Sequence, residues 1–296
     1  MRSRDILACV SWSGRFGRRF ARRRSALVGL VLAVILVGLA VVSPGDPTGL
    51  DVDRGLSELG LPLPPSADAP LGTDHLGRDV LARIADGAGT SLSVAALATL
   101  LSLLIGATVG LVAGYAGGWV DQVLMRLVDL VLAFPFLLLA ILLAAVLRKN
   151  GLVASSTPVV FTLAIAGWTT AARVIRTKVR TLATSDFITA ARALGASPSR
   201  IIARHLLPNV AGVIVTVAVL GFAQNLLAEA TLSYLGLGPP PPDATWGRML
   251  YEGRTFYRTA PHLLLVPGLA ITIAVISFHL LAEGLRTALD DSEARA

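Results

Sequence analysis

Six long runs of mostly apolar, nearly uncharged residues dominate the chain. A helix needs about 20 such residues to cross the hydrocarbon of a bilayer, and each run is near or above that length. The composition agrees, because 54% of the residues are hydrophobic, 15% are charged and the mean hydropathy is +0.70. The sequence predicts a single-domain, all-α polytopic membrane protein with about six transmembrane helices. The runs are Ser25–Val42, Gly87–Val120, Leu127–Leu147, Gly151–Ala172, Asn209–Ala228 and His262–Ala282.

Positive charge is concentrated in two segments. Residues 1–24 hold eight arginines and one acidic residue, and residues 173–204 form a second basic group. Cytoplasmic segments of membrane proteins carry an excess of Lys and Arg, so both are predicted to be cytoplasmic, and six spans place both termini there. The predicted location is the cell (inner or plasma) membrane, with multiple passes. The net charge of +7 implies no nucleic-acid partner, because topology and contact with anionic membrane lipid explain arginines at membrane ends.

The first apolar run has the basic flank of a secretory signal peptide. It is longer than the usual apolar region of such peptides, and the residues after Val42 lack a convincing cleavage site, which favours a retained anchor. The lone Cys9 excludes an internal disulfide and a multi-cysteine metal site. The predicted organisation is a basic cytoplasmic segment (1–24), a first anchor (25–42), an extracytoplasmic segment (43–87), a core domain (88–285) with a cytoplasmic loop (176–208), and a cytoplasmic tail (286–296).

The basic loop between the fourth and fifth runs has strong helix start and stop signals. Four apolar residues at helical spacing mark one helix, with Ser185 or Asp186 as its cap and Gly195 as its left-handed stop. The Ser-Pro pair at 197–198 predicts a second helix, which is expected to give way to the next span at Pro208. On spacing alone, this loop also fits an ordinary amphipathic helix on the membrane surface. The apolar residues are Phe187, Ala190, Ala191 and Leu194.

The spacing of the Ala-Ala pair at 190–191, Gly195 and the Leu-Pro pair at 207–208 resembles the EAA loop of permease subunits of binding-protein-dependent ABC importers. In that family the first helix of the loop is a coupling helix, which sits in a groove of the cytoplasmic ATPase. The chain departs from the family pattern at Thr189, where an acidic residue is usual. The resemblance implies an ATPase-coupling role for Phe187, Thr189, Ala190, Ala191, Arg192, Leu194, Gly195 and Pro208.

Further blocks, together spanning about residues 70–290, resemble the C-type permease subunits of dipeptide and oligopeptide importers. In the first block, Thr73 or Asp74 is predicted to cap a helix, and Asp79 and Arg83 share one face of it. A metal site at Asp74, His75 and Asp79 is disfavoured, because a second histidine at ligand spacing is missing. The blocks are Pro70–Arg83, Gly114–Asp121, Met125–Asp129, Ala133–Pro135, Glu229–Pro240, Trp246–Leu250, Pro267–Leu269 and Gly284–Asp290.

The resemblance implies the type I ABC importer permease fold and import of peptides of the dipeptide or oligopeptide class. It also implies a second homologous permease, two cytoplasmic ATP-binding subunits and an extracytoplasmic substrate-binding protein. The sequence lacks a phosphate-binding G-x-x-x-x-G-K-[ST] loop and the motifs of membrane peptidases, so we predict no catalytic residue, no cofactor and no metal. The alternative is a secondary transporter or a channel-like membrane protein without an ATPase partner.

A few ionisable residues fall within or beside the apolar runs, where a charge costs about 2.5–3.5 kcal/mol on insertion scales. Asp129 and Glu283 are expected to pair with nearby arginines of their own helices, Arg126 and Arg286. His279 is expected to pack against a neighbouring helix. Near the outer end of the fifth run, Glu229 is a candidate for the translocation path. The possible translocation path comprises Glu229, Gln224 and Asn225.

Overall fold

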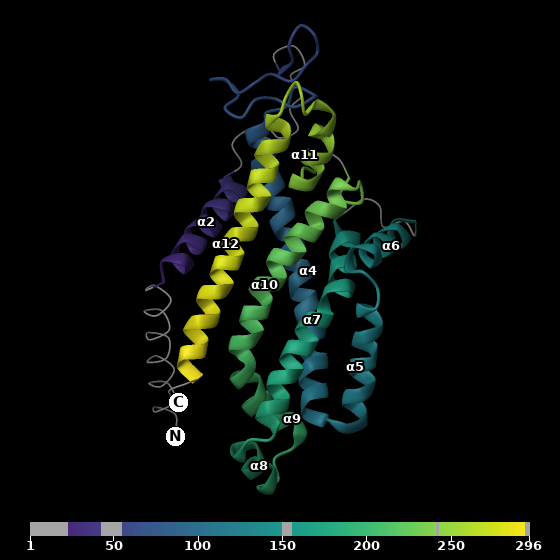
Figure 1. Ribbon diagram of the computed structural model, residues 1–296, viewed down its shortest axis with the longest axis vertical. Helices are drawn as coiled ribbons and strands as arrows, with labels where there is room; N and C mark the ends of the chain where they lie inside the picture. The colour runs from purple at the N-terminus through teal and green to yellow at the C-terminus, as the bar shows by residue number, and fades with distance from the viewer. Residues whose placement is uncertain (1–22, 43–54, 150–155, 241–242, 294–296) are drawn as a thin grey trace.

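The computed structural model describes residues 23–42, 55–149, 156–240 and 243–293 (Figure 1). Most of the predicted basic segment 1–24, the start of the extracytoplasmic segment 43–87 and the last residues of the tail lie outside these ranges. The described part is helical, with two isolated bridges between residues of the loop that precedes α4. The elements are α2 (Arg24–Val42), α4 (Val80–Ala116), α5 (Gly118–Leu132), α6 (Phe136–Lys149), α7 (Thr157–Ala183), α8 (Asp186–Ala193), α9 (Pro198–Ile201), η1 (Ile202–Leu206), α10 (Leu207–Tyr234), α11 (Trp246–Gly253), η2 (Arg254–Phe256) and α12 (His262–Glu293).

Five helical stretches in the described ranges are long and apolar enough to cross a membrane, and a sixth arises if α5 and α6 form one broken span. This agrees with the prediction of about six spans. Four of the stretches are α2, α4, α7 and α12, and the fifth runs without interruption from α9 to the end of α10. One end of the bundle carries α8 and the other carries α11, and these are called the α8 end and the α11 end below (Figure 1).

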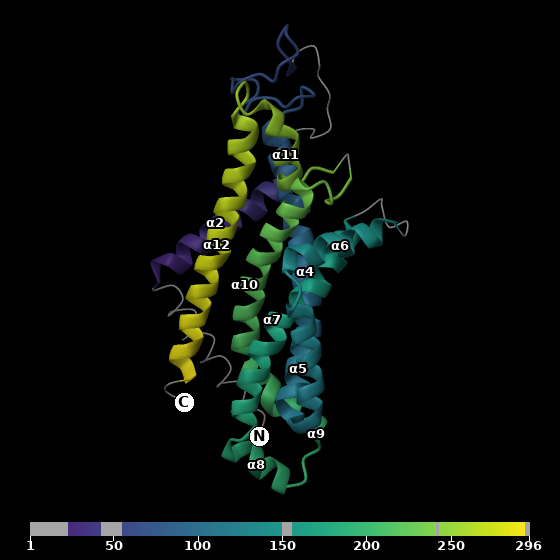
Figure 2. The same cartoon turned by 45° about the vertical axis from the view of Figure 1, so that its right-hand side comes forward.

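The third apolar run is broken rather than continuous. The chain turns by 85° between α5 and α6, at Ala133 to Pro135, and α6 leaves the bundle as a lateral arm (Figure 2). Proline has no backbone N–H and disfavours helical geometry in the residue before it, so a sharp bend at this position has a local cause. This bend agrees with the resemblance of Ala133–Pro135 to the kinked third span of the C-type permease subunits, and it divides the predicted run Leu127–Leu147 into two helices.

The tightest helix pair is α4 against α7. Gly106, Gly110 and Gly114 line up along one face of α4, four residues apart, and a β-carbon on any of them would lie 2.5–2.8 Å from a backbone oxygen of α7. Small residues at this spacing let two transmembrane backbones approach closely, which is the usual way such helices pack in lipid. The sequence analysis did not use this spacing, which is visible in the printed sequence.

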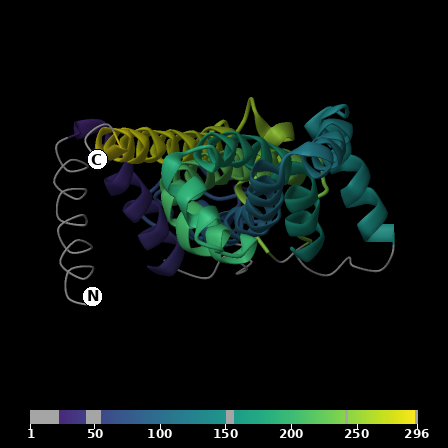
Figure 3. The same cartoon turned by 90° about the horizontal axis from the view of Figure 1, so that it is seen from below.

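The remaining spans are arranged around this pair. Seen from below, α2 and α12 lie at one edge of the molecule, and α5 and α6 lie at the opposite edge (Figure 3). The α2 and α12 helices are joined where Ser277 Oγ donates a hydrogen bond of 2.8 Å to the carbonyl oxygen of Gly29. The predicted start of the next span at Pro208 agrees with the structure, in which α10 begins at Leu207. The chain passes from α9 through the π-helical turn η1 into α10, and proline is tolerated because it lies in the first turn.

Candidate functional site

At the α8 end, a short helix, a glycine turn and a second short helix project beyond the spans (Figure 1). Gly195 has φ +78°, and the backbone N–H groups of Gly195 and Ala196 donate to the carbonyl oxygens of Arg192 and Ala191 at 3.0 and 3.1 Å. These two hydrogen bonds form a Schellman motif, so the predicted left-handed end of the helix is confirmed. Ser185 occupies the N-cap position, but its hydroxyl donates instead to the carbonyl oxygen of Leu182.

One face of α8 packs against the helix bundle, and the other is exposed. Ile188 is fully buried and packs in a cluster with apolar residues of α7, α9 and α10, and Ala191 packs against the same cluster. The outer face leaves Phe187 45% and Leu194 89% exposed, and Ala190 lies on this exposed side. The predicted apolar stripe is therefore divided, since Ala191 faces the bundle more than the solvent. Ile188, which anchors the helix, was missed by the sequence analysis.

The remaining residues of the predicted coupling set lie around these faces. Arg192 places its guanidinium 5.0 Å from the ring centre of Tyr115 at the end of α4, a cation–π contact that links α8 to this span. The hydroxyl of Thr189 is exposed and donates to the carbonyl oxygen of Ser185 at 3.2 Å. Pro208 is exposed in the first turn of α10, away from α8.

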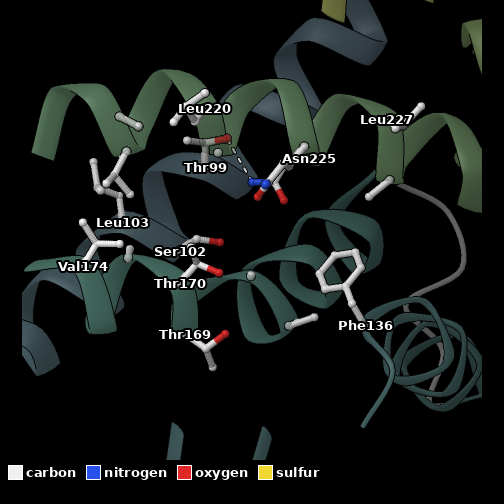
Figure 4. Close-up of a pocket in the computed structure, with 18 of the residues that line it drawn as sticks. Thr99, Ser102, Leu103, Phe136, Thr169, Thr170, Val174, Leu220, Asn225 and Leu227 are labelled. Carbon is white, nitrogen blue, oxygen red and sulfur yellow. Dashed lines mark hydrogen bonds between the residues drawn. The ribbon is translucent and has the colours of Figure 1, made fainter. Parts of the chain in front are cut away.

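A cavity of about 950 Å³ opens between α4, the α5–α6 elbow, α7 and α10 (Figure 4). Its walls combine apolar side chains with the hydroxyl and amide groups of six Ser and Thr residues, Gln224 and Asn225. Among the described lining residues, Arg286 of α12 is the one that carries a charge. A lining of this size, with hydrogen-bonding groups and a single charged residue among the described ones, suits a small polar solute better than a lipid chain.

Of the three residues predicted for a translocation path, Gln224 and Asn225 line the cavity and Glu229 does not. The Glu229 side chain is fully buried between α10, α4 and the start of α11. Its Oε1 accepts a hydrogen bond of 2.6 Å from Ser233 Oγ, and within the described part of the chain its Oε2 has no hydrogen-bond partner. Glu229 is thus buried under α11 and outside the cavity, although Ala228 and Thr231 of the same helix line it.

At the α11 end, two carboxylates are enclosed by three arginines. Arg83 Nη1 donates to Asp74 Oδ2 at 2.7 Å and to Glu252 Oε2 at 2.8 Å, and Arg78 contacts the same two carboxylates. Arg248 Nε completes the cluster on Glu252 Oε1 at 2.8 Å. Burial alone would raise the pKa of both carboxyls, but the arginines outweigh it and hold each pKa below its ordinary value.

The structure around this ionic cluster corrects the predicted helix cap at Thr73 or Asp74. The helix cap is Asp79, whose carboxylate accepts from the backbone N–H of Leu81, and Arg83 pairs with Asp74 and Glu252. His75 lies near both carboxylates in a geometry that resembles a metal site. Every oxygen of Asp74 and Glu252 already accepts a hydrogen bond, however, and three of the donors are cationic side chains, so these residues do not fit a cation.

Two further expectations about charged residues are corrected. Asp129 forms its ion pair with Arg173 of α7 and not with Arg126 of its own helix. His279 is exposed, and its Nδ1 lies 3.2 Å from the carbonyl oxygen of Val275 in its own helix. An additional ion pair joins Asp121 at the start of α5 to Arg176 of α7. Ion pairs between helices, rather than within them, therefore tie α5 to the α4–α7 core.

Residues 106–294 match the family described as the binding-protein-dependent transport system inner membrane component. The dipeptide transport system permease protein DppC of Alkalihalophilus pseudofirmus is 37% identical over 97% of this chain and 92% of its own. The glutathione transport system permease protein GsiD of Pectobacterium atrosepticum is 37% identical over 97% of this chain and 93% of its own. A chain in an inward-facing structure of the MetNI methionine ABC transporter shares the fold, with a TM-score of 0.59 and 18% identity over 70% of this chain and 96% of that one.

Proposed function

This chain belongs to the family of binding-protein-dependent transport system inner membrane components, and we propose that it forms part of the translocation path of an importer for small peptides. It is a permease subunit of an ABC importer with the type I fold. Two relatives are permeases for dipeptides and for glutathione, and this favours short peptides as the solute. They give no support to a secondary transporter.

The α8 segment is the observation that carries this proposal. A surface helix that only rests on lipid would turn its apolar face toward the membrane. Here Ile188 fixes α8 to the bundle core, while Phe187, Ala190 and Leu194 remain on the exposed side. An exposed small residue between two large apolar ones suits the groove of a partner protein, and we assign that partner as an ATP-binding subunit. Motion of α8 would reach the spans through Ile188 and through Arg192 on Tyr115.

We place the α8 end in the cytoplasm and the α11 end outside. The arginines of α7, α8 and the following turn crowd the α8 end, as expected for cytoplasmic loops. At the α11 end, Arg78, Arg83 and Arg248 are paired with the carboxylates of Asp74 and Glu252, so the three arginines leave a net charge of only about +1 there. In this orientation the α12 tail is cytoplasmic and α11 faces the substrate-binding protein.

The cavity between α4, the α5–α6 elbow, α7 and α10 is assigned to the translocation path. Its hydroxyl and amide groups would be costly against lipid chains, so we expect a second permease subunit to cover its open side and enclose water there. The sequence contains no phosphate-binding motif, which supports the proposal that ATP is hydrolysed on two separate subunits. Membrane lipid would contact the remaining apolar surface of the spans.

Reconstitution tests the proposal. Proteoliposomes that hold the complete complex should accumulate a short peptide when ATP and the binding protein are present, and uptake should stop when the P-loop lysine of the ATPase is replaced. In the same complex, a cysteine introduced at Ala190 should form a cross-link to the ATP-binding subunit, whereas one introduced at Thr272 of α12 should not. Peptide accumulation driven by a proton gradient in liposomes containing this chain alone would overturn the ABC assignment.

A further inference from the structure

Near the middle of the cavity, one side chain from α10 and one from α4 hold each other in a fixed orientation. Asn225 Nδ2 lies 3.0 Å from Thr99 Oγ1, as the dashed line in Figure 4 shows. Thr99 Oγ1 also lies 2.6 Å from the carbonyl oxygen of Ala95. A hydroxyl has one hydrogen, which goes to this carbonyl, so toward Asn225 the hydroxyl can only accept. The amide nitrogen of Asn225 must therefore face Thr99.

The orientation of the amide leaves its oxygen directed away from Thr99. Within the described chain, Asn225 Oδ1 has no hydrogen-bond partner, although the side chain as a whole is 5% exposed. Beside it lies Gly167 of α7, where a β-carbon would be 3.5 Å from Asn225 Oδ1 and 3.2 Å from Ser102 Oγ. The missing side chain of Gly167 thus leaves room in front of two oxygen acceptors from two different helices.

Ser102 adds the second acceptor. Its hydroxyl donates to the carbonyl oxygen of Ala164 over a long 3.3 Å contact, which leaves the lone pairs of Oγ available. The region formed by Asn225, Ser102 and Gly167, here called the acceptor ledge, is uncharged, and Arg286 is the one charged residue among the described residues that line the cavity. An uncharged group of acceptors favours ligands with N–H donors and does not discriminate between cationic and anionic side chains.

We infer that the acceptor ledge is a subsite of the translocation path that binds N–H groups of a passing peptide and is indifferent to the charge of its side chains. The ligand groups are backbone amide N–H groups or the terminal ammonium. This inference rests on the proposed function, because it assumes that the cavity is the path. It goes further by naming the chemistry that the path recognises and the residues that supply it.

The first arm of the test introduces a charge in a side chain of nearly the same shape, and it also replaces the Nδ2 donor to Thr99 by an oxygen. The complete complex in proteoliposomes is given Ala-Lys-Ala or Ala-Glu-Ala, and uptake of the two tripeptides is compared. Asn225→Asp should raise the ratio of lysine-peptide to glutamate-peptide uptake about tenfold, which corresponds to about 1.4 kcal/mol. The control Asn209→Asp makes the same change on α10 outside the cavity, and it should leave the ratio unchanged.

The second arm fills the space in front of the acceptors. Gly167→Ala should lower uptake of both peptides about fivefold or more, because its β-carbon would crowd Ser102 Oγ at 3.2 Å. The control Gly221→Ala lines the same cavity, but its β-carbon would make only an ordinary 3.7 Å contact with Thr99 Cγ2, so uptake should be retained. ATP hydrolysis stimulated by the binding protein, and assembly of the complex, should stay intact in all four variants.

An N-acetylated tripeptide separates the two sources of N–H groups. If Gly167→Ala slows the acetylated and free peptides equally, the amides are the ligand groups, and if it slows only the free peptide, the ammonium is. Failure of the wild-type complex to take up either tripeptide would refute the proposed function. Wild-type uptake of both tripeptides, with an unchanged ratio in Asn225→Asp and unchanged rates in Gly167→Ala, would refute the acceptor ledge alone.

Discussion

A β-carbon added to Gly110 would lie 2.7 Å from the carbonyl oxygen of Ala172. The same relation recurs one turn away in each direction, where Gly106 faces Trp168 and Gly114 faces Arg176. The two backbones are therefore in contact along several turns. Residues of α4 and α7 line the cavity and also pack against Ile188, the anchor of α8. The close packing of the two helices therefore positions both the cavity and α8.

Replacement of Gly110 by alanine should force α4 and α7 apart. Overpacking of this kind costs about 1–3 kcal/mol, since the obstructing atom is a backbone oxygen that cannot rotate away. The measurement is the thermal midpoint of the detergent-purified protein, followed by size-exclusion chromatography. Gly268→Ala in α12 is the control, because a β-carbon there meets no atom within 4 Å. Equal thermal midpoints for the two variants would contradict the packing argument.

Two substitutions in α8 should separate anchoring from docking. Leu194→Asp changes a side chain that is 89% exposed, so the fold should be retained while co-purification of the ATP-binding subunit falls at least severalfold. Ile188→Asp would bury an unpaired carboxylate in the cluster below α8 and should lower both the yield of folded permease and the co-purification. If Leu194→Asp retains wild-type ATPase binding and coupled hydrolysis, the exposed face is not the docking surface.

The ionic cluster at the α11 end predicts a pH dependence. The folded-state pKa values of Asp74 and Glu252 lie below their ordinary values of 3.8 and 4.5, so these carboxylates stabilise the fold fully above about pH 4.5 and lose that effect as the pH falls through the lowered values. Glu252→Gln should cost up to about 3–5 kcal/mol near neutral pH and should flatten the acid limb of the stability curve. Thermal midpoints measured from about pH 7 to pH 3 test this.

The control for this prediction is Glu58→Gln, which removes an exposed carboxylate from the same end of the molecule. Its stability curve should follow that of the wild-type protein. An acid limb of unchanged steepness in Glu252→Gln would show that the cluster does not set the pH dependence.

Glu229 should tolerate an amide better than a hydrocarbon side chain. In Glu229→Gln the amide oxygen can still accept from Ser233 Oγ, and this hydrogen bond is 2.6 Å long in the wild-type protein. Glu229→Leu leaves the buried hydroxyl of Ser233 without this acceptor, which costs about 1–3 kcal/mol. Thermal midpoints and transport rates should therefore follow the order wild type, Gln, Leu. Equal losses in the Gln and Leu variants would show that the carboxylate itself is required.

Local features were predictable from the sequence because their causes lie within a few residues. Apolar runs of membrane-spanning length gave the spans, and Gly195 after an amphipathic stretch gave the left-handed helix end that the structure contains. The spacing around Ala190 resembles the EAA loop of a family that residues 106–294 match, whereas the coupling role of this loop stays a prediction. The proline at position 135 is a local signal for a bend, but the angle of 85° between α5 and α6 could not be predicted from it.

The partners of individual side chains were decided by tertiary structure alone. Sequence spacing paired Asp129 with Arg126, whereas packing pairs Asp129 with Arg173. Packing also gives Arg83 a partner, Glu252, that is far away in the sequence. Likewise, Glu229 was expected in the translocation path and is instead sealed under α11, whereas Gln224 and Asn225 line the cavity. Helical periodicity gives the angle of each residue around its own axis, but the rotation of one helix against another depends on close contacts such as that between Gly110 and Ala172.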